Sequence, residues 1–260
     1  MAGGLALFFT FGAIIGSFLN VVILRYGTKS ITGRSLCLSC GRTLSWYELI
    51  PLVSFLSLRG RCRTCGARIS WQYPLVELAT GLIFAAVLVK TSLLFPPLSF
   101  WSMVYCLLSI VLWSLLIVIA VYDLRHQIIP DRMVYSFLFL SLLFLVSRLP
   151  ASPAGGSPLL SDLLGGFALA LPFALIWLLS RGRAMGLGDA KLVVGFPWFL
   201  GLWGGLSAVI FGFWMGATVA LLLLWRKGNR LTMKTELPLA PFLIAGLLIV
   251  YLSGFVLIYI

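Results

Sequence analysis

Two aspartates stand at the edges of apolar runs, where carboxylates could do chemistry. Asp123 follows the apolar stretch 100–122, and Asp189 precedes the shorter stretch 190–201. A charged side chain beside hydrocarbon is costly, so such a residue is a candidate for function. Two neighbouring carboxylates share one proton, which lets one activate water while the other protonates a leaving group. If the fold joins Asp123 and Asp189, the pair could hydrolyse a peptide bond.

A structural explanation competes with this one at each aspartate. Arg125 and His126 could offset the charge of Asp123 in a solvated loop. Asp189 could instead cap a helix that starts just after it. A negative charge at the C-terminal end of a helix opposes the helix dipole, so stability alone does not explain Asp123. We therefore favour a functional role for both residues.

The residues around Asp189 suggest how a substrate could reach it. Gly186 and Gly188 precede the aspartate, and glycines permit unusual backbone geometry and the close approach of an extended peptide. Lys191 could hold the carboxylate of Asp189 ionised. Asp131, which follows a proline, is expected to be the N-cap of the next helix.

Other catalytic arrangements find little support in the sequence. His126 is the single histidine, no Ser–His or Cys–His arrangement is apparent, and the His-Glu-x-x-His motif of zinc proteases is absent. Among the remaining acidic residues, Glu48 is expected at the surface of a loop and Glu77 at the beginning of a helix. The two aspartates remain the strongest candidates for catalysis.

Four cysteines predict a structural zinc site. Cys37 and Cys40 form one Cys-x-x-Cys pair, Cys62 and Cys65 form another, and 21 residues separate the pairs. Two such pairs suit tetrahedral zinc, and four sulfur ligands leave no open position for catalysis. Disulfides are the alternative, but a reducing cytoplasmic loop disfavours them. A glycine follows each pair, as the tight turn of a zinc knuckle requires.

The composition indicates an all-α polytopic membrane protein. Of the 260 residues 61% are hydrophobic and only 10% are charged, whereas a membrane helix needs roughly 20 mostly apolar residues. We expect about eight transmembrane helices, with a turn near Gly201. The apolar runs lie at about 4–24, 75–92, 100–122, 132–148, 159–180, 190–201, 203–225 and 238–260.

The basic residues predict which side of the membrane the loops occupy, because Lys and Arg concentrate on cytoplasmic loops. An outward N-terminus places 25–73, 123–131, 181–191 and 226–237 in the cytoplasm. Lys90 and Arg148 are then the only basic residues on the other side. The net charge of +12 is therefore mainly a signal of topology and of attraction to the lipid bilayer. Charges spread over four short loops do not favour nucleic-acid binding.

These observations divide the chain into three parts. Residues 1–24 are expected to form the first transmembrane helix, and 74–260 a multi-helix transmembrane peptidase domain. Between them, 25–73 is expected to form a small cytoplasmic zinc-binding domain, because so short a segment rarely sustains a hydrophobic core without metal or disulfides.

Taken together, the motifs resemble those of the type IV prepilin peptidases, membrane aspartic proteases of the Gly-x-Gly-Asp class. The resemblance runs over nearly the whole chain. It includes both cysteine pairs and the stretches Gly16–Val22, Trp46–Pro51, Tyr73–Leu78, Asp123–Asp131 and Met185–Leu192.

The resemblance implies that Asp123 and Asp189 are the catalytic pair. It also implies an enzyme of the bacterial inner membrane with its active site at the cytoplasmic face. The substrate would be a prepilin or a type II secretion pseudopilin, cut after a glycine to remove a short basic leader. Many members of the family also methylate the new N-terminus with S-adenosylmethionine, and here that activity rests on the resemblance alone.

Three other classes of function remain open from the sequence. A presenilin-like or signal-peptide-peptidase protease shares the glycine–aspartate motif but does not account for the zinc loop. An ion-coupled transporter would usually place its carboxylates near the middle of the bilayer and show paired repeats. An assembly scaffold would tolerate Asp123→Asn and Asp189→Asn.

Overall fold

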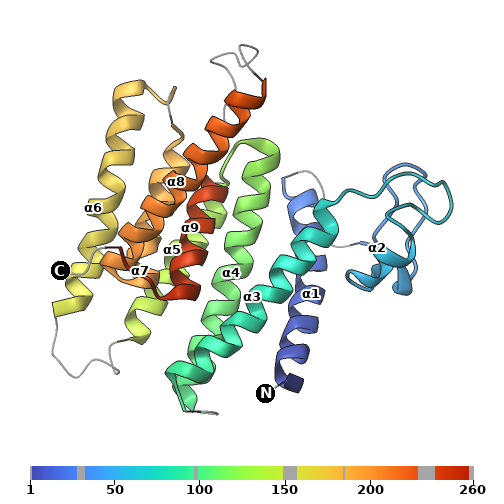
Figure 1. The fold of residues 1–260 in the computed structure, drawn as a ribbon, viewed down its shortest axis with the longest axis horizontal. Coiled ribbons are helices and arrows are strands. Elements are labelled where there is room, and N and C mark those ends of the chain that lie inside the picture. The colour runs from blue at the N-terminus through green and yellow to red at the C-terminus, as the bar shows by residue number, and fades with distance from the viewer. Residues whose placement is uncertain are drawn as a thin grey trace. The chain divides into compact units, whose positions relative to one another are not determined.

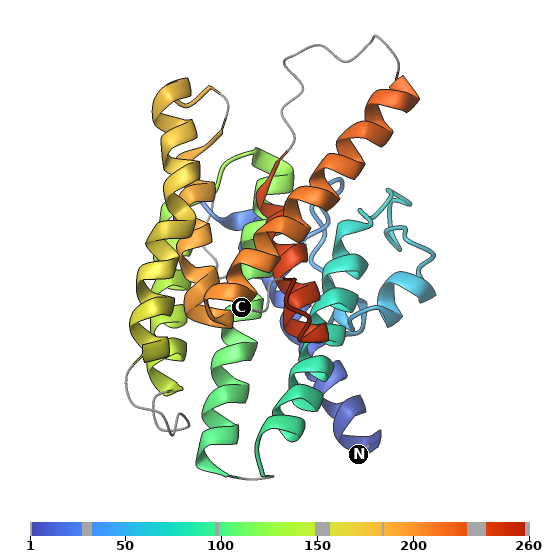
Figure 2. The ribbon, with the colours of Figure 1, turned by 60° about the vertical axis from the view of Figure 1, so that its left-hand side comes forward.

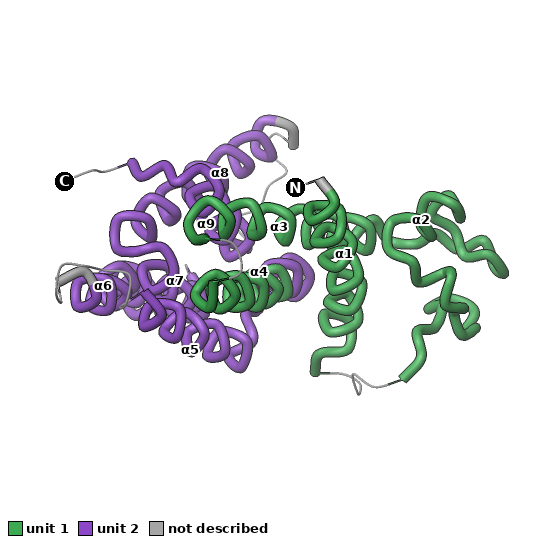
Figure 3. The backbone as a smooth tube through the Cα atoms, turned by 90° about the horizontal axis from the view of Figure 1, so that it is seen from below, with its two compact units in different colours: residues 1–118 green, residues 119–260 purple. Residues whose placement is uncertain are grey.

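The computed structural model describes residues 2–27, 33–96, 99–148, 157–183, 185–227 and 238–257. Over these ranges the chain is helical, with two isolated β-bridges and no β-strand. It divides into two compact units, residues 1–118 and 119–260 (Figure 3). The expected all-α class is confirmed.

The first unit pairs two long helices and carries a small loop subdomain. Its elements are α1 (Ala2–Arg25), η1 (Trp46–Leu49), α2 (Val53–Ser57), α3 (Gln72–Leu94) and the first part of α4 (Phe100–His126). Helices α1 and α3 lie side by side (Figure 1). A Cβ atom at Gly16 would stand 2.8 Å from the Cα of Glu77, so the glycine permits this close approach of the two backbones.

The second unit is built around α7. It contains the end of α4, then α5 (Asp131–Ser147), α6 (Ser157–Ser180), α7 (Leu187–Leu200), α8 (Leu202–Lys227) and α9 (Ala240–Ser253). Helix α7 contacts α5, α6 and α8, and α8 packs along α9 (Figure 2). Phe196 and Phe199 of α7 are fully buried. The short helix that carries Asp189 is therefore held from several sides.

Five of the helices are long and apolar enough to cross a membrane. Helices α5, α7 and α9 have 17, 14 and 14 residues, fewer than the roughly 20 that a perpendicular span needs. The chain is thus a multi-pass membrane protein by its helices, but the eight predicted spans are not confirmed. The five candidates are Gly3–Arg25, Gln72–Leu94, Phe100–His126, Leu159–Ser180 and Leu202–Trp225.

The predicted turn at Gly201 is confirmed. This residue has φ of +86° and separates α7 from α8, a conformation that favours glycine. Asp162 stabilises the turn, because its carboxylate accepts a hydrogen bond of 2.7 Å from the backbone N–H of Leu202. Helix α7 begins at Leu187, slightly before the start that the sequence indicated, and α9 ends at Ser253. Most of the predicted cytoplasmic segment 226–237 lies outside the described residues.

Candidate active site and metal site

Asp123 lies in the last turn of α4, within the second unit. Its side chain is buried, with the residue only 5% exposed. The backbone N–H of Ala240, at the beginning of α9, donates a hydrogen bond to its carboxylate. N–H groups at the start of a helix lack partners within that helix and stabilise negative charge. The other oxygen, Oδ2, has no hydrogen-bond partner among the residues that the structure describes.

Asp189 lies in the first turn of α7 and is 8% exposed. The cap position of this helix is Gly186, and no side chain caps it. Oδ1 of Asp189 finds no hydrogen-bond partner in the described parts of the chain. Burial, and secondly the negative charge of Asp123, raise the pKa of Asp189. The alternative that Asp189 serves as the N-cap of α7 is therefore wrong.

The second unit thus brings the two predicted aspartates into electrostatic contact. Each is buried, and each has one carboxylate oxygen without a hydrogen-bond partner among the residues that the structure describes. A buried polar atom without a partner is costly, so native proteins keep few of them and such atoms often mark sites of function. Two close, buried carboxyls can share one proton, because two neighbouring negative charges are costly, and a shared proton is what acid–base catalysis by such a pair requires.

The two glycines before Asp189 differ in their surroundings. Gly188 lies within α7, and a Cβ atom there would stand 2.9 Å from the Cβ of Ile129. Gly186 has φ of −75°, and the nearest contact of its Cβ would be Asp189 Oδ2 at 3.7 Å. Neither glycine uses the unusual backbone geometry that its residue type permits, because neither has a positive φ. Gly188 permits the close packing of α7 on the segment that follows α4, whereas a Cβ at Gly186 would make only ordinary van der Waals contact with the carboxylate of Asp189.

Lys191 does not pair with Asp189. Its Nζ donates a hydrogen bond of 2.7 Å to Oδ1 of Asp131, and the ammonium also lies 5.2 Å from the ring centroid of Tyr135. The sequence suggested Asp189 as the partner of Lys191, whereas the observed partner is Asp131, the first residue of α5. The cap position of α5 is Pro130, with no side-chain cap. The prediction that Asp131 caps this helix is therefore wrong, because its carboxylate is turned to Lys191.

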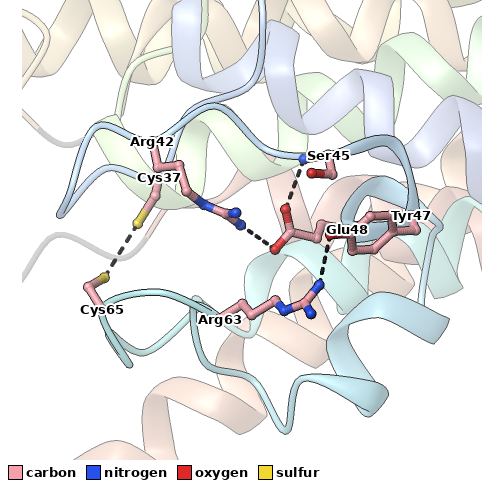
Figure 4. A network of polar contacts seen from close by, with 7 residues as sticks. All are labelled: Cys37, Arg42, Ser45, Tyr47, Glu48, Arg63 and Cys65. Carbon is pink, nitrogen blue, oxygen red and sulfur yellow. Dashed lines mark hydrogen bonds and ion pairs between the residues drawn. The ribbon is translucent and has the colours of Figure 1, made fainter.

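The four predicted cysteine ligands lie together in the first unit. All four sulfur atoms are within 4.8 Å of one another. The sulfurs of Cys37 and Cys65 are 3.9 Å apart (Figure 4). Tetrahedral zinc with Zn–S bonds of 2.3 Å separates its sulfurs by about 3.8 Å, whereas a disulfide is about 2.05 Å long. The cluster therefore fits a metal ion and not a pair of disulfides.

Two similar tight turns present the sulfurs. The N–H groups of Gly41 and Gly66 donate hydrogen bonds of 2.9 Å to the carbonyls of Cys37 and Cys62. Both glycines have positive φ, +71° and +68°, as predicted for knuckle turns. The N–H of Cys40, followed by that of Ser39, lowers the pKa of the Cys37 thiol to about 6. Stabilised thiolates are the form of cysteine that binds zinc.

Comparison with known proteins decides the family. Residues 10–91 match the bacterial peptidase A24 N-terminal domain, and residues 110–223 match the type IV leader peptidase family. A protein of Bacillus subtilis named prepilin leader peptidase/N-methyltransferase is 36% identical over 96% of this chain and 94% of its own length. The chain belongs to the type IV leader peptidase family.

Further relatives carry the same name. One from Myxococcus xanthus is 37% identical over 85% of this chain, which covers 63% of that protein's length. One from Vibrio cholerae is 29% identical over 96% of both chains. No solved structure matches this type IV leader peptidase. The leader peptidase region 110–223 contains both Asp123 and Asp189, and the N-terminal region 10–91 contains all four clustered cysteines.

The structure of this leader peptidase also reveals a buried acid that sequence analysis missed. Glu48, expected at the surface, is buried beside the cysteine turns (Figure 4). Its carboxylate accepts a hydrogen bond of 2.8 Å from the N–H of Ser45 and forms an ion pair with Arg42. The Ser45 N–H, together with Arg42, lowers the pKa of Glu48. The pattern Ser-x-x-Glu at 45–48, a capping box, was the available signal.

The sequence analysis also expected Glu77 in the wrong position, at the beginning of a helix. It is the sixth residue of α3 and is buried, not at the helix entry. Its carboxylate accepts a hydrogen bond of 2.8 Å from the N–H of Leu52, between η1 and α2. Glu77 therefore fastens the loop subdomain to α3.

Proposed function

We propose that this leader peptidase removes the basic leader from type IV prepilins or type II secretion pseudopilins, with Asp123 and Asp189 as its catalytic residues. The observation that carries the proposal is the pair of buried, electrostatically coupled carboxyls, each with one oxygen that has no hydrogen-bond partner in the described part of the chain. The names of the relatives supply the substrate class. A transporter or a presenilin-like protease is not favoured by these family matches.

The environments of the two carboxyls suggest their roles. Both carboxyls are buried, but the N–H of Ala240 favours the charged form of Asp123, whereas the negative charge of its neighbour favours the protonated form of Asp189. Asp123 then removes a proton from water, and the water oxygen attacks the carbonyl carbon of the scissile peptide. Asp189 donates its proton to the carbonyl oxygen, and the collapse of the tetrahedral intermediate transfers a proton to the leaving amine. Both carboxyls return to their initial states when the products leave.

The position of the pair along the chain fits cleavage at a membrane boundary. Asp123 is three residues before the C-terminal end of the candidate span Phe100–His126. A prepilin whose apolar helix lies in the bilayer would present its leader junction at that level. The distribution of basic residues supports a cytoplasmic active site in the inner membrane of a bacterium.

We propose zinc as a structural ion at Cys37, Cys40, Cys62 and Cys65, where it would hold the two turns together.

The relatives' names also include N-methyltransferase. We therefore propose that S-adenosylmethionine supplies a methyl group to the newly exposed amine, and that the N-terminal part of the chain around 25–73 serves this second activity. A test is methylation of a prepilin that lacks its leader: Asp123→Asn should retain it, and removal of zinc should abolish it.

The peptidase proposal is tested by processing in cells. A prepilin with an intact leader is co-expressed with the wild type, Asp123→Asn, Asp189→Asn or the control Asp131→Asn, and leader removal is followed by gel shift. We expect loss of processing in the first two variants and slower but substantial processing in the control, which only weakens the contact of Asp131 with Lys191. Full processing by either catalytic variant would overturn the assignment.

A further inference from the structure

The loop subdomain of the first unit exposes large apolar side chains that its fold does not use. Trp46 of η1 is 77% exposed, and Leu56 of α2 is 74% exposed. Val53 is also exposed, and at three residues from Leu56 it shares a side of α2 with it. Trp71, just before α3, is exposed as well and lies against the ring of Phe55 at a centroid distance of 4.9 Å. These residues belong to none of the candidate membrane spans.

A hydrogen bond attaches this subdomain near the start of α3. The N–H of Leu52 is bonded to Glu77, which lies five residues inside the span that starts at Gln72. At a rise of 1.5 Å per residue, that is about 7.5 Å below the start of the helix. Figures 1 and 2 show α2 near the end at which α3 begins. Leu52, between η1 and α2, is therefore held close to the start of α3, where a bilayer crossed by this helix would present its headgroups.

A second attachment comes from the end of α1. The guanidinium of Arg25 donates hydrogen bonds of 3.3 Å to the carbonyl of Gly33 and 2.9 Å to that of Arg34. Arg25 is the last residue of its candidate span. The subdomain is thus fastened to the ends of two membrane helices and cannot move far into the aqueous phase.

The positive charge of the subdomain indicates that its apolar surface contacts anionic lipid and not a basic peptide. Residues 33–71 contain a single acidic residue, Glu48, which is already paired. Arginines exposed near anionic lipid attract its headgroups, and tryptophan is enriched at the membrane interface. A basic prepilin leader would be repelled by the same charges. The exposed arginines are Arg34, Arg59, Arg61, Arg63 and Arg68.

We propose that residues 46–57, together with Trp71, dock on the anionic inner surface of the bilayer. The apolar side chains of η1 and α2 enter the headgroup region, while Arg59 and Arg61, directly after α2, bind lipid phosphates. The zinc-binding turns are then held beside the membrane as a peripheral anchor, in addition to the spanning helices. The inference does not depend on the peptidase assignment.

Photo-crosslinking of the full chain in lipid nanodiscs tests the proposal. A diazirine amino acid replaces Leu56 or, in a matched control, Leu38, an 84% exposed leucine on the first cysteine turn. After irradiation, mass spectrometry identifies the adduct, and retained zinc reports correct folding. In phosphatidylethanolamine–phosphatidylglycerol bilayers we expect phospholipid adducts at position 56 in several-fold excess over position 38. Equal yields, or adducts at position 56 with protein (added prepilin or the chain itself), would overturn the proposal.

The electrostatic part has its own test. The double variant Arg59→Gln and Arg61→Gln, carrying the probe at position 56, should lose lipid adducts several-fold in bilayers that contain phosphatidylglycerol. In pure phosphatidylcholine the same substitutions should change the yield little, because no anionic headgroups are present. An unchanged yield in the anionic bilayer would show that the arginines do not bind the lipid.

Discussion

Lys191 and Asp131 join α7 to the beginning of α5 through a hydrogen bond of 2.7 Å, although 60 residues separate them in the sequence. Lys191 is two residues from Asp189, and Asp131 is near Ile129, against which Gly188 packs. The ion pair therefore holds the first turn of α7 to the segment that follows Asp123. We infer that Lys191 is a positioning residue for the carboxyl pair.

Loss of this ion pair should affect turnover more than stability. The Asp131 side chain is 60% exposed, and such pairs contribute less than about 1 kcal/mol to stability. Lys191→Met should lower kcat several-fold and leave the melting temperature nearly unchanged, because it loosens Asp189 without unfolding α7. The charge-reversed double variant Lys191→Asp with Asp131→Lys should recover part of kcat. A variant that lowers the melting temperature and kcat in parallel, without recovery in the double variant, would contradict a positioning role.

The two glycines before Asp189 provide a matched pair of substitutions. Gly188→Ala places a Cβ 2.9 Å from the Cβ of Ile129, and overpacking of this kind costs about 1–3 kcal/mol. It should lower both the melting temperature and the processing of prepilin. In Gly186→Ala the nearest contact of the new Cβ is Asp189 Oδ2 at 3.7 Å, and the backbone has an ordinary φ. The melting temperature of this variant should therefore match that of the wild type. Similar losses of stability in the two variants would refute the packing argument.

The pH dependence of stability should reveal the buried acid. Burial and the charge of Asp123 raise the pKa of Asp189 from its value of 3.8. Stability is then greatest below that unfolded value and is lost as the pH rises through the raised folded value, because the unfolded state releases the proton more easily. Asp189→Asn removes this penalty, so at neutral pH it should melt at a higher temperature than the wild type while being inactive. An equal or lower melting temperature would argue against a buried, coupled carboxyl.

The same shift bears on catalysis. If Asp189 donates its proton, cleavage should decline on the alkaline side as the pH passes its raised pKa. Single-turnover cleavage of prepilin, followed across neutral pH in reconstituted vesicles, measures this limb. A rate that continues to rise with pH would show that the protonated form of Asp189 is not required.

Removal of zinc should act locally. A segment this short rarely sustains a hydrophobic core without metal, so chelation should expose residues 37–65 to protease before the membrane helices. Cys62→Ser should reproduce this pattern, whereas Cys106→Ser, a change in α4 outside the cluster, should not. Uniform proteolysis along the chain after chelation would contradict a local structural role.

The features that sequence analysis predicted well depend on local patterns. The cysteine turns followed from the Cys-x-x-Cys-Gly spacing, and the positive φ of Gly41 and Gly66 agrees. The helix break at Gly201 followed from a run too long for one helix. Asp123 and Asp189 stood out because a carboxylate at the edge of an apolar run is costly.

The features that it missed depend on contacts between distant segments. Nothing near Lys191 in the sequence indicates that Asp131, rather than Asp189, is its partner. The burial of Glu77 arises because Leu52, 25 residues earlier, needs an acceptor for its N–H. Periodicity also does not distinguish a short buried helix such as α7 from a membrane span, which is why eight spans were expected.

The coupling of Asp123 and Asp189 is tested most directly by a double-variant cycle of cleavage. Rates are measured for Asp123→Asn, Asp189→Asn and the double variant in reconstituted vesicles, with folding confirmed by zinc content and melting temperature. Each single variant should lose about a hundredfold or more of the rate, and the double variant should lose little beyond that, because the two carboxyls act as a unit. Near-normal cleavage by either single variant, or losses that multiply in the double variant, would contradict a catalytic pair.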